Sequence, residues 1–161
     1  MTDKTKIVKP EQSLNKKLGN IKFDEAFDKT TMSSAEESYA GKQEAFKNET
    51  LNDFARMKTV FDNLSDSTLD ERMYQRISEL AFSIKSRAAT GGIPLASEIA
   101  NSMYKFSDAA RAILPKKGFV VLKLHFDSLT SIFNATTYDE AQKSKLVKGL
   151  EDVAKKFLEE K

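Results

Sequence analysis

Apolar residues recur at steps of three and four along most of this 161-residue chain, which is the period of one face of an α-helix. The stretches with this pattern run from Tyr39 to Leu64, Leu69 to Ala88, Leu95 to Ile113, Leu122 to Phe133 and Leu146 to Phe157. Only short connections separate them, and short connections favour antiparallel neighbours. We therefore predict an all-α fold, an up-down antiparallel helical bundle with an N-terminal arm.

Polar residues, glycines and prolines predict where these helices begin and end. The expected starts are Ser33 or Ser34 with Glu36 or Glu37, Ser67 or Thr68 with Asp70 or Glu71, and Thr137 with Asp139 and Glu140. Gly91 and Gly92 can supply the left-handed cap that ends the second helix. Pro94 suits the first turn of the third helix, and Pro115 stops that helix.

The first part of the chain differs from the rest. Residues 1–32 are rich in lysine, contain Pro10 and Gly19, and carry only scattered apolar residues. We predict a partly ordered arm at 1–32, with a short helical turn around residues 21–27, and a helical bundle domain at 33–161.

Composition excludes several classes of function. The 26 Lys and Arg nearly balance the 24 Asp and Glu, so no positive field favours nucleic acid as a partner. Cysteine is absent and His125 is the single histidine, so we expect no metal and no cofactor. No apolar run approaches the roughly 20 residues that cross a bilayer, and the polar start lacks the core of a signal peptide. We expect a cytoplasmic protein that does not bind membranes.

Residues 81–106, AFSIKSRAATGGIPLASEIANSMYKF, carry the most specific motif. This run resembles the active helix and following turn of histidine-containing phosphotransfer (HPt) domains, in the branch written roughly as AHDIKGxAxTFGYPLxxEIAxSL. The matching positions, in order and without gaps, are Lys85, Ala88 to Thr90, Gly92, Pro94, Leu95 and Glu98 to Ser102. Weaker similarity covers IVKPEQSLNKKLG and VLKLHFDSLTSIF. The resemblance implies a four-helix HPt-like core with an additional helix.

The phosphoacceptor histidine of that family pattern falls on Phe82, whose ring has no nitrogen to carry a phosphoryl group. Lys85, which partners the phosphoryl group in the family, is kept, whereas Ser83 and Ser86 replace the usual Asp and Gly. If Leu80 and Ile84 face the core, Phe82 lies about 200° from each of them, on the outward face. No nucleophile–base set, Walker loop or dinucleotide fingerprint is visible either. We therefore expect binding without catalysis.

The resemblance implies a catalytically silent HPt-like protein of two-component signalling. Its expected partner is the receiver domain of a response regulator, and the expected binding residues are Phe82, Ser83, Lys85, Ser86 and Ala89.

Two alternatives stay open. One is a structural bundle that forms a homodimer or binds an unrelated protein without using the Phe82 face. The other, phosphotransfer through His125, is disfavoured because this residue lies between Leu122 and Leu129 at helical spacing, where a histidine is usually a packing residue.

Overall fold

The computed structural model describes residues 29–113, 118–134 and 137–159. Contacts divide the chain into two units, Met1–Tyr39 and Ala40–Lys161. Of the first unit, the described part is the beginning of one helix, residues 29–39. The predicted arm at 1–32, apart from its last four residues, and the predicted turn at 21–27 lie outside the described residues.

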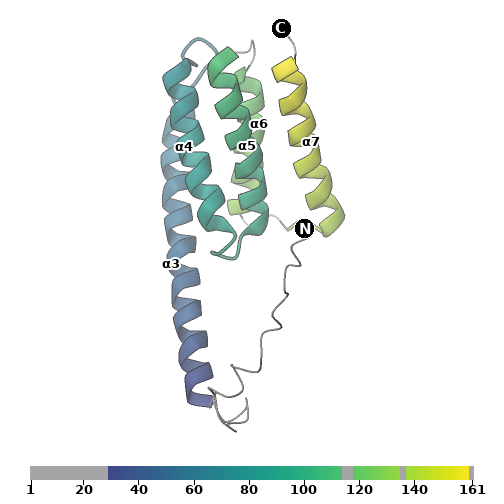
Figure 1. Ribbon diagram of the computed structural model, residues 1–161. Coiled ribbons are helices and arrows are strands. Elements are labelled where there is room, and N and C mark those ends of the chain that lie inside the picture. The colour runs from purple at the N-terminus through teal and green to yellow at the C-terminus, as the bar shows by residue number, and fades with distance from the viewer. Residues whose placement is uncertain (1–28, 114–117, 135–136, 160–161) are drawn as a thin grey trace, which may run out of the picture. The chain divides into compact units, whose positions relative to one another are not determined.

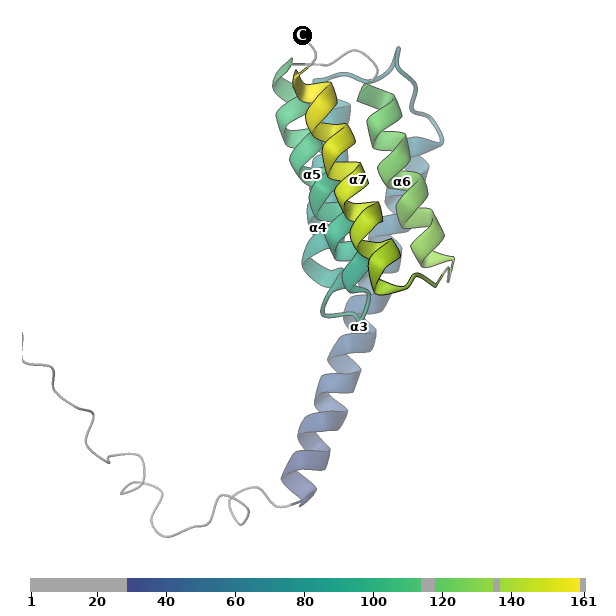
Figure 2. The ribbon, with the colours of Figure 1, turned by 90° about the vertical axis from the view of Figure 1, so that its right-hand side faces the viewer.

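The described residues form helices and no strand (Figure 1). The helices are α3 (Lys29–Phe61), α4 (Glu71–Ala88), α5 (Pro94–Ile113), α6 (Gly118–Phe133) and α7 (Glu140–Glu159). Within the unit Ala40–Lys161, successive helices run in opposite directions (Figures 1 and 2). The prediction of an all-α helical bundle is confirmed.

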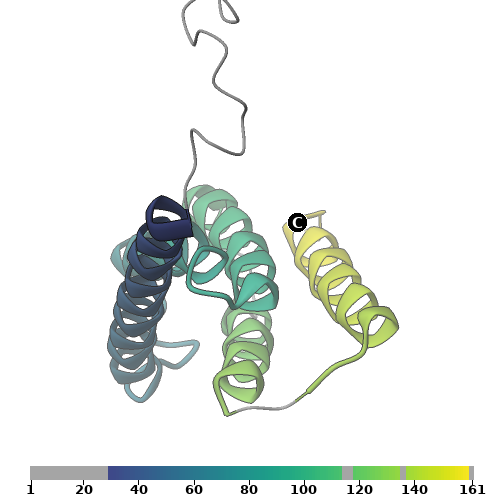
Figure 3. The same ribbon diagram turned by 90° about the horizontal axis from the view of Figure 1, so that it is seen from below.

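Within this unit, helix α5 packs against α4, α6 and α7, and α6 also packs against α7. Figure 3 shows α7 at one edge of the group. Helix α6 also contacts α3: the Phe126 ring of α6 stacks on two rings of α3, with centroid distances of 5.6 Å to Phe54 and 4.3 Å to Phe61. The core lies between α3, α4, α5 and α6, and its fully buried apolar side chains include Met57, Ile77, Ile84, Ile99, Met103, Phe106, Leu122 and Leu129.

Most positions predicted to face inward are buried or partly buried, but two are exposed. Tyr39 is 63% exposed and Ile113 is 55% exposed. Tyr39 is the first apolar residue of its stripe and Ile113 is the last residue of α5. Helical periodicity identifies the apolar face of a helix, whereas burial also requires a neighbouring helix at that level.

The predicted start of the first long helix is wrong by one turn. Helix α3 begins at Lys29, so Ser33 and Ser34 lie inside it instead of capping it. No glycine or proline interrupts residues 29–40, so the helix extends beyond the local capping signal. In α7 the predicted start is confirmed, because the helix begins at Glu140, but the capping pair is Asp139 with Gln142. The Asp139 and Gln142 side chains each accept a hydrogen bond from the other's backbone N–H, at 2.8 and 3.0 Å, just before Glu140 and within the first turn.

Helix α4 starts later than predicted, because its first hydroxyl groups are used elsewhere. Thr68 Oγ1 accepts a hydrogen bond from the Ser65 backbone N–H at 2.9 Å and closes a separate turn. Asp70 is the N-cap instead, and its carboxylate accepts from the Met73 N–H at 2.8 Å.

The turn between α4 and α5 forms as predicted. Gly92 has φ +81°, the Ile93 N–H donates to the Ala88 carbonyl at 2.7 Å, and α5 begins at Pro94. A Cβ atom on Gly91 would lie 2.9 Å from the backbone nitrogen of Lys47, so the turn packs directly on the α3 backbone. This contact fixes the α4–α5 hairpin, which carries the candidate site.

Candidate functional site

Phe82 lies on the outward face of α4, as its spacing from the core residues requires. It is 50% exposed, whereas Leu80 is 8% exposed and Ile84 is fully buried. The covered half of the ring contacts α5: the Phe82 and Tyr104 ring centroids are 5.5 Å apart at an interplanar angle of 56°. Phe82 is therefore one half of an aromatic pair that bridges two helices.

The Lys85 ammonium lies against both rings of this pair. Its Nζ atom is 5.8 Å from the Phe82 ring centroid and 5.3 Å from the Tyr104 ring centroid, within the range of cation–π attraction. Among the described residues, Lys85 forms no ion pair with a carboxylate. We call Phe82, Lys85 and Tyr104 the aromatic–lysine cluster.

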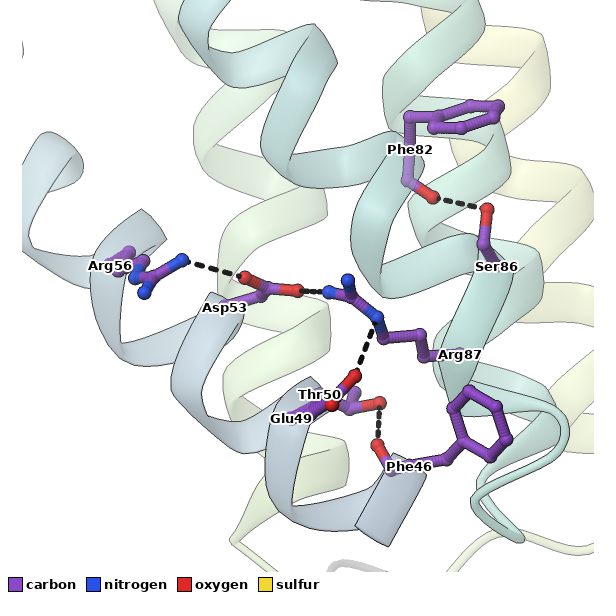
Figure 4. A network of polar contacts seen from close by, with 8 residues as sticks. All are labelled: Phe46, Glu49, Thr50, Asp53, Arg56, Phe82, Ser86 and Arg87. Carbon is purple, nitrogen blue, oxygen red and sulfur yellow. Dashed lines mark hydrogen bonds and ion pairs between the residues drawn. The ribbon is translucent and has the colours of Figure 1, made fainter. Parts of the chain in front are cut away.

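The other predicted binding residues surround Phe82 on α4 and just after its end. Ser83 is partly exposed, and Ser86 and Ala89 are exposed. The Ser86 hydroxyl donates to the Phe82 backbone carbonyl at 2.8 Å, and the Phe82 ring points away from this bond (Figure 4). Because the Ser86 hydroxyl has a partner within its own helix, Phe82 and Lys85 are the distinctive groups of the predicted set.

Sequence reasoning missed Tyr104, which the fold adds to this site. A signal was present, because Tyr104 lies between Met103 and Phe106, both buried, and so falls beside the core stripe of α5. The periodicity of α5 shows that Tyr104 faces partly outward, but it does not identify the α4 residue beside it.

An ion-pair network fastens α4 to α3 next to the cluster (Figure 4). Asp53 of α3 is 3% exposed, and its carboxylate pairs with the Arg87 guanidinium of α4. Arg87 Nε also lies 3.0 Å from a carboxylate oxygen of Glu49, and Arg56 Nη1 lies 3.4 Å from the second Asp53 oxygen. A buried carboxylate shared by two guanidinium groups restricts how α4 can move on α3.

His125 is fully buried between α5 and α6. Its Nδ1 lies 2.8 Å from the Val121 carbonyl, which can only accept, so Nδ1 carries the proton. In the neutral ring, Nε2 then accepts from the Ser102 hydroxyl at 2.9 Å. Burial lowers the pKa of His125, which keeps the ring neutral. Another protein's aspartate cannot reach this ring while the bundle is intact.

The described surface also has a groove whose lining is mostly polar and charged and includes no residue of the aromatic–lysine cluster. This groove of about 740 Å³ between α5 and α7 is lined by side chains of both charges, among them Glu98, Lys148 and Asp152. Within residues 29–113, 118–134 and 137–159, no group of His, Asp and Glu side chains is arranged to hold a metal ion. No helix in this part of the chain combines the length and apolar character needed to cross a bilayer.

The described residues thus define an all-α bundle that presents an aromatic–lysine cluster on two adjacent helices. No protein-family model, curated protein or solved structure matches the chain.

Proposed function

We propose that this chain is a catalytically silent HPt-like protein of two-component signalling that binds the receiver domain of a response regulator through the face around Phe82. The supporting observation is that Phe82, at the motif position of the phosphoacceptor histidine, is half exposed with the Lys85 ammonium beside it. Binding without phosphotransfer allows such a protein to compete with a genuine phosphotransfer protein or to hold a receiver in one state.

The chemistry of the cluster suits protein binding. An exposed aromatic ring beside a cation provides an apolar anchor with a charged rim, the arrangement that typically dominates binding energy at protein interfaces. The active sites of receiver domains carry clustered carboxylates, which an ammonium beside the anchor complements.

Catalytic silence is tested with a phosphorylated receiver domain labelled on its aspartate. We expect no acid-labile label on this chain, because Phe82 lacks a nitrogen and His125 is buried. Label that reaches His125, and is lost in His125→Ala, would overturn the proposal.

Conversely, Phe82→His places an imidazole beside Lys85 and is expected to accept label. Leu124→His, at a 43% exposed position on α6, is the matched control that should not.

Binding is tested by calorimetric titration of each purified receiver domain from the source organism. Phe82→Ala is expected to weaken the affinity by about 2 kcal/mol or more, as at other interface anchors. Because half of the Phe82 ring packs on Tyr104, we expect Phe82→Ala to reduce fold stability by only about 1 kcal/mol. Leu124→Ala should leave the affinity unchanged. Ile84→Ala, a core truncation, should instead destabilise the fold by roughly 2–5 kcal/mol.

A second candidate function is a structural bundle that pairs with another copy or another protein away from Phe82. The observation in its favour is that Val120 and Leu124, one turn apart on α6, are each 43% exposed. Sedimentation of the wild type and of Leu124→Glu tests it. A dimer that Leu124→Glu dissociates, together with receiver affinity unaffected by Phe82→Ala, would favour this function over the first.

A further inference from the structure

We infer that the partner of this face spans both α4 and α5, with Tyr104 as a second anchor and a carboxylate of the partner on the Lys85 ammonium. This inference rests on the proposed function. It adds to that function the second helix of the interface and the charge that the partner must present.

The position of Tyr104 makes it part of any interface that covers Phe82. The two ring centroids are 5.5 Å apart, and each ring is partly exposed, so the rings form one continuous surface across the two helices. A protein surface that excludes water from Phe82 also covers Tyr104. The Tyr104 hydroxyl adds a hydrogen-bond donor that the Phe82 ring lacks, which suits an acidic partner.

The position of Lys85 is restricted before any partner arrives. Its ammonium lies against both rings, and the Ser97 hydroxyl of α5 donates to the Lys85 backbone carbonyl at 2.7 Å. A long flexible side chain normally loses rotamer freedom on binding. Part of that loss has already occurred here, so an anion meets a cation that is pre-positioned between the two aromatic anchors.

The charge of Lys85 determines what the partner must bring. Lys85 has no carboxylate partner among the described residues, and covering an ammonium without supplying an anion is unfavourable. A partner that buries this cluster therefore gains by placing a carboxylate on Lys85. The cluster offers one cation between two rings instead of a row of cations, which fits a carboxylate group and not the repeated phosphates of a polynucleotide.

The test titrates the full chain with each purified receiver domain of the source organism. We expect Tyr104→Ala and Lys85→Met each to weaken binding about tenfold or more. Lys85→Met should also flatten the salt dependence of the affinity, because it removes the interfacial charge. Tyr39→Ala, at a 63% exposed tyrosine outside the cluster, is the matched control and should change the affinity less than about twofold.

A measurement on the wild type guards against variants that misfold. Bound receiver should shift or broaden the ring resonances of both Phe82 and Tyr104. If no receiver domain binds, the proposed function is overturned, and this inference with it. If Phe82→Ala weakens binding while Tyr104→Ala does not, and the Tyr104 resonances stay unchanged, this inference alone is overturned. Affinity that Lys85→Met leaves unchanged would overturn the carboxylate contact.

Discussion

Gly118, the first residue of α6, lies so close to Tyr74 that adding one methyl group should destabilise the fold. A Cβ atom on Gly118 would overlap Tyr74 Oη and would lie 3.1 Å from Tyr74 Cζ. Tyr74 is 1% exposed, and its ring packs edge-on against Phe106 at 6.4 Å between centroids. Because the ring cannot swing into solvent, Gly118→Ala must displace either the ring or the start of α6.

The magnitude follows from two opposing terms. Overpacking a core typically costs about 1–3 kcal/mol, and replacing glycine by alanine in a helix regains roughly 0.5–1 kcal/mol. We expect Gly118→Ala to lower the free energy of unfolding by about 1–2 kcal/mol. Gly149→Ala in α7 is the matched control. Apart from the adjacent residues and the backbone of its own helix, nothing lies within 4 Å of its added Cβ, so this change should stabilise the fold by up to about 1 kcal/mol.

Removing the Tyr74 hydroxyl should relieve the clash. Tyr74 Oη is buried without a hydrogen-bond partner among the described residues, and burial raises the Tyr74 pKa to about 12, so the group stays neutral. Tyr74→Phe alone should therefore be neutral or slightly stabilising. In the Tyr74→Phe background, the cost of Gly118→Ala should fall by about 1 kcal/mol or more, because the nearest remaining atom is Cζ.

Urea unfolding followed by circular dichroism gives these free energies of unfolding. If the dependence of the free energy on urea concentration is the same for all variants, their unfolding transitions are comparable. The reasoning fails if Gly118→Ala stabilises as much as Gly149→Ala does. It also fails if Gly118→Ala costs the same with and without the Tyr74 hydroxyl.

The remaining predictions concern the ion-pair network, the histidine and α7. Asp53→Ala should destabilise by about 1–3 kcal/mol because it strips Arg87 of a buried partner, whereas Glu49→Ala, at an exposed position, should cost less than about 1 kcal/mol in the same melts; equal costs would contradict this. Folding lowers the pKa of His125, so as the pH falls this side chain takes up its proton at a higher pH in the unfolded chain than in the folded one. The free energy of unfolding should therefore fall as the pH drops below about 6.5. His125→Gln should lack this component, and an identical pH profile would refute it. Helix α7 buries two side chains where α5 buries nine, so its amides should exchange hydrogen before those of α5; equal protection would show otherwise.

Which side chains pack in the interior was predictable because apolar residues recur at steps of three and four along each helix. The stripe through Ile77, Leu80 and Ile84 orients α4, and the same periodicity turns Phe82 outward. The turn at Gly92 and Pro94 was equally predictable, since a left-handed residue and a first-turn proline each restrict the backbone locally.

Helix starts were harder because several polar residues compete for the same backbone groups. Thr68 matched a capping pattern, but its hydroxyl closes the turn with Ser65 and leaves the cap to Asp70. A sequence pattern records which residues are able to cap. It does not record which of them is already bonded elsewhere.

Tyr104 shows how a contact between helices follows once the turn between them is known. Lys85 and Ser97 lie equally far from Gly91 along the chain, and the bond between them sets the level of the antiparallel pair. Counted from Gly91 along each helix, Tyr104 therefore lies about one helical turn further away than Phe82 does. Side chains lean toward the N-terminus of their own helix, so Phe82 leans away from the turn and Tyr104 leans toward it. The two rings therefore converge, and Lys85, one turn after Phe82, can reach both.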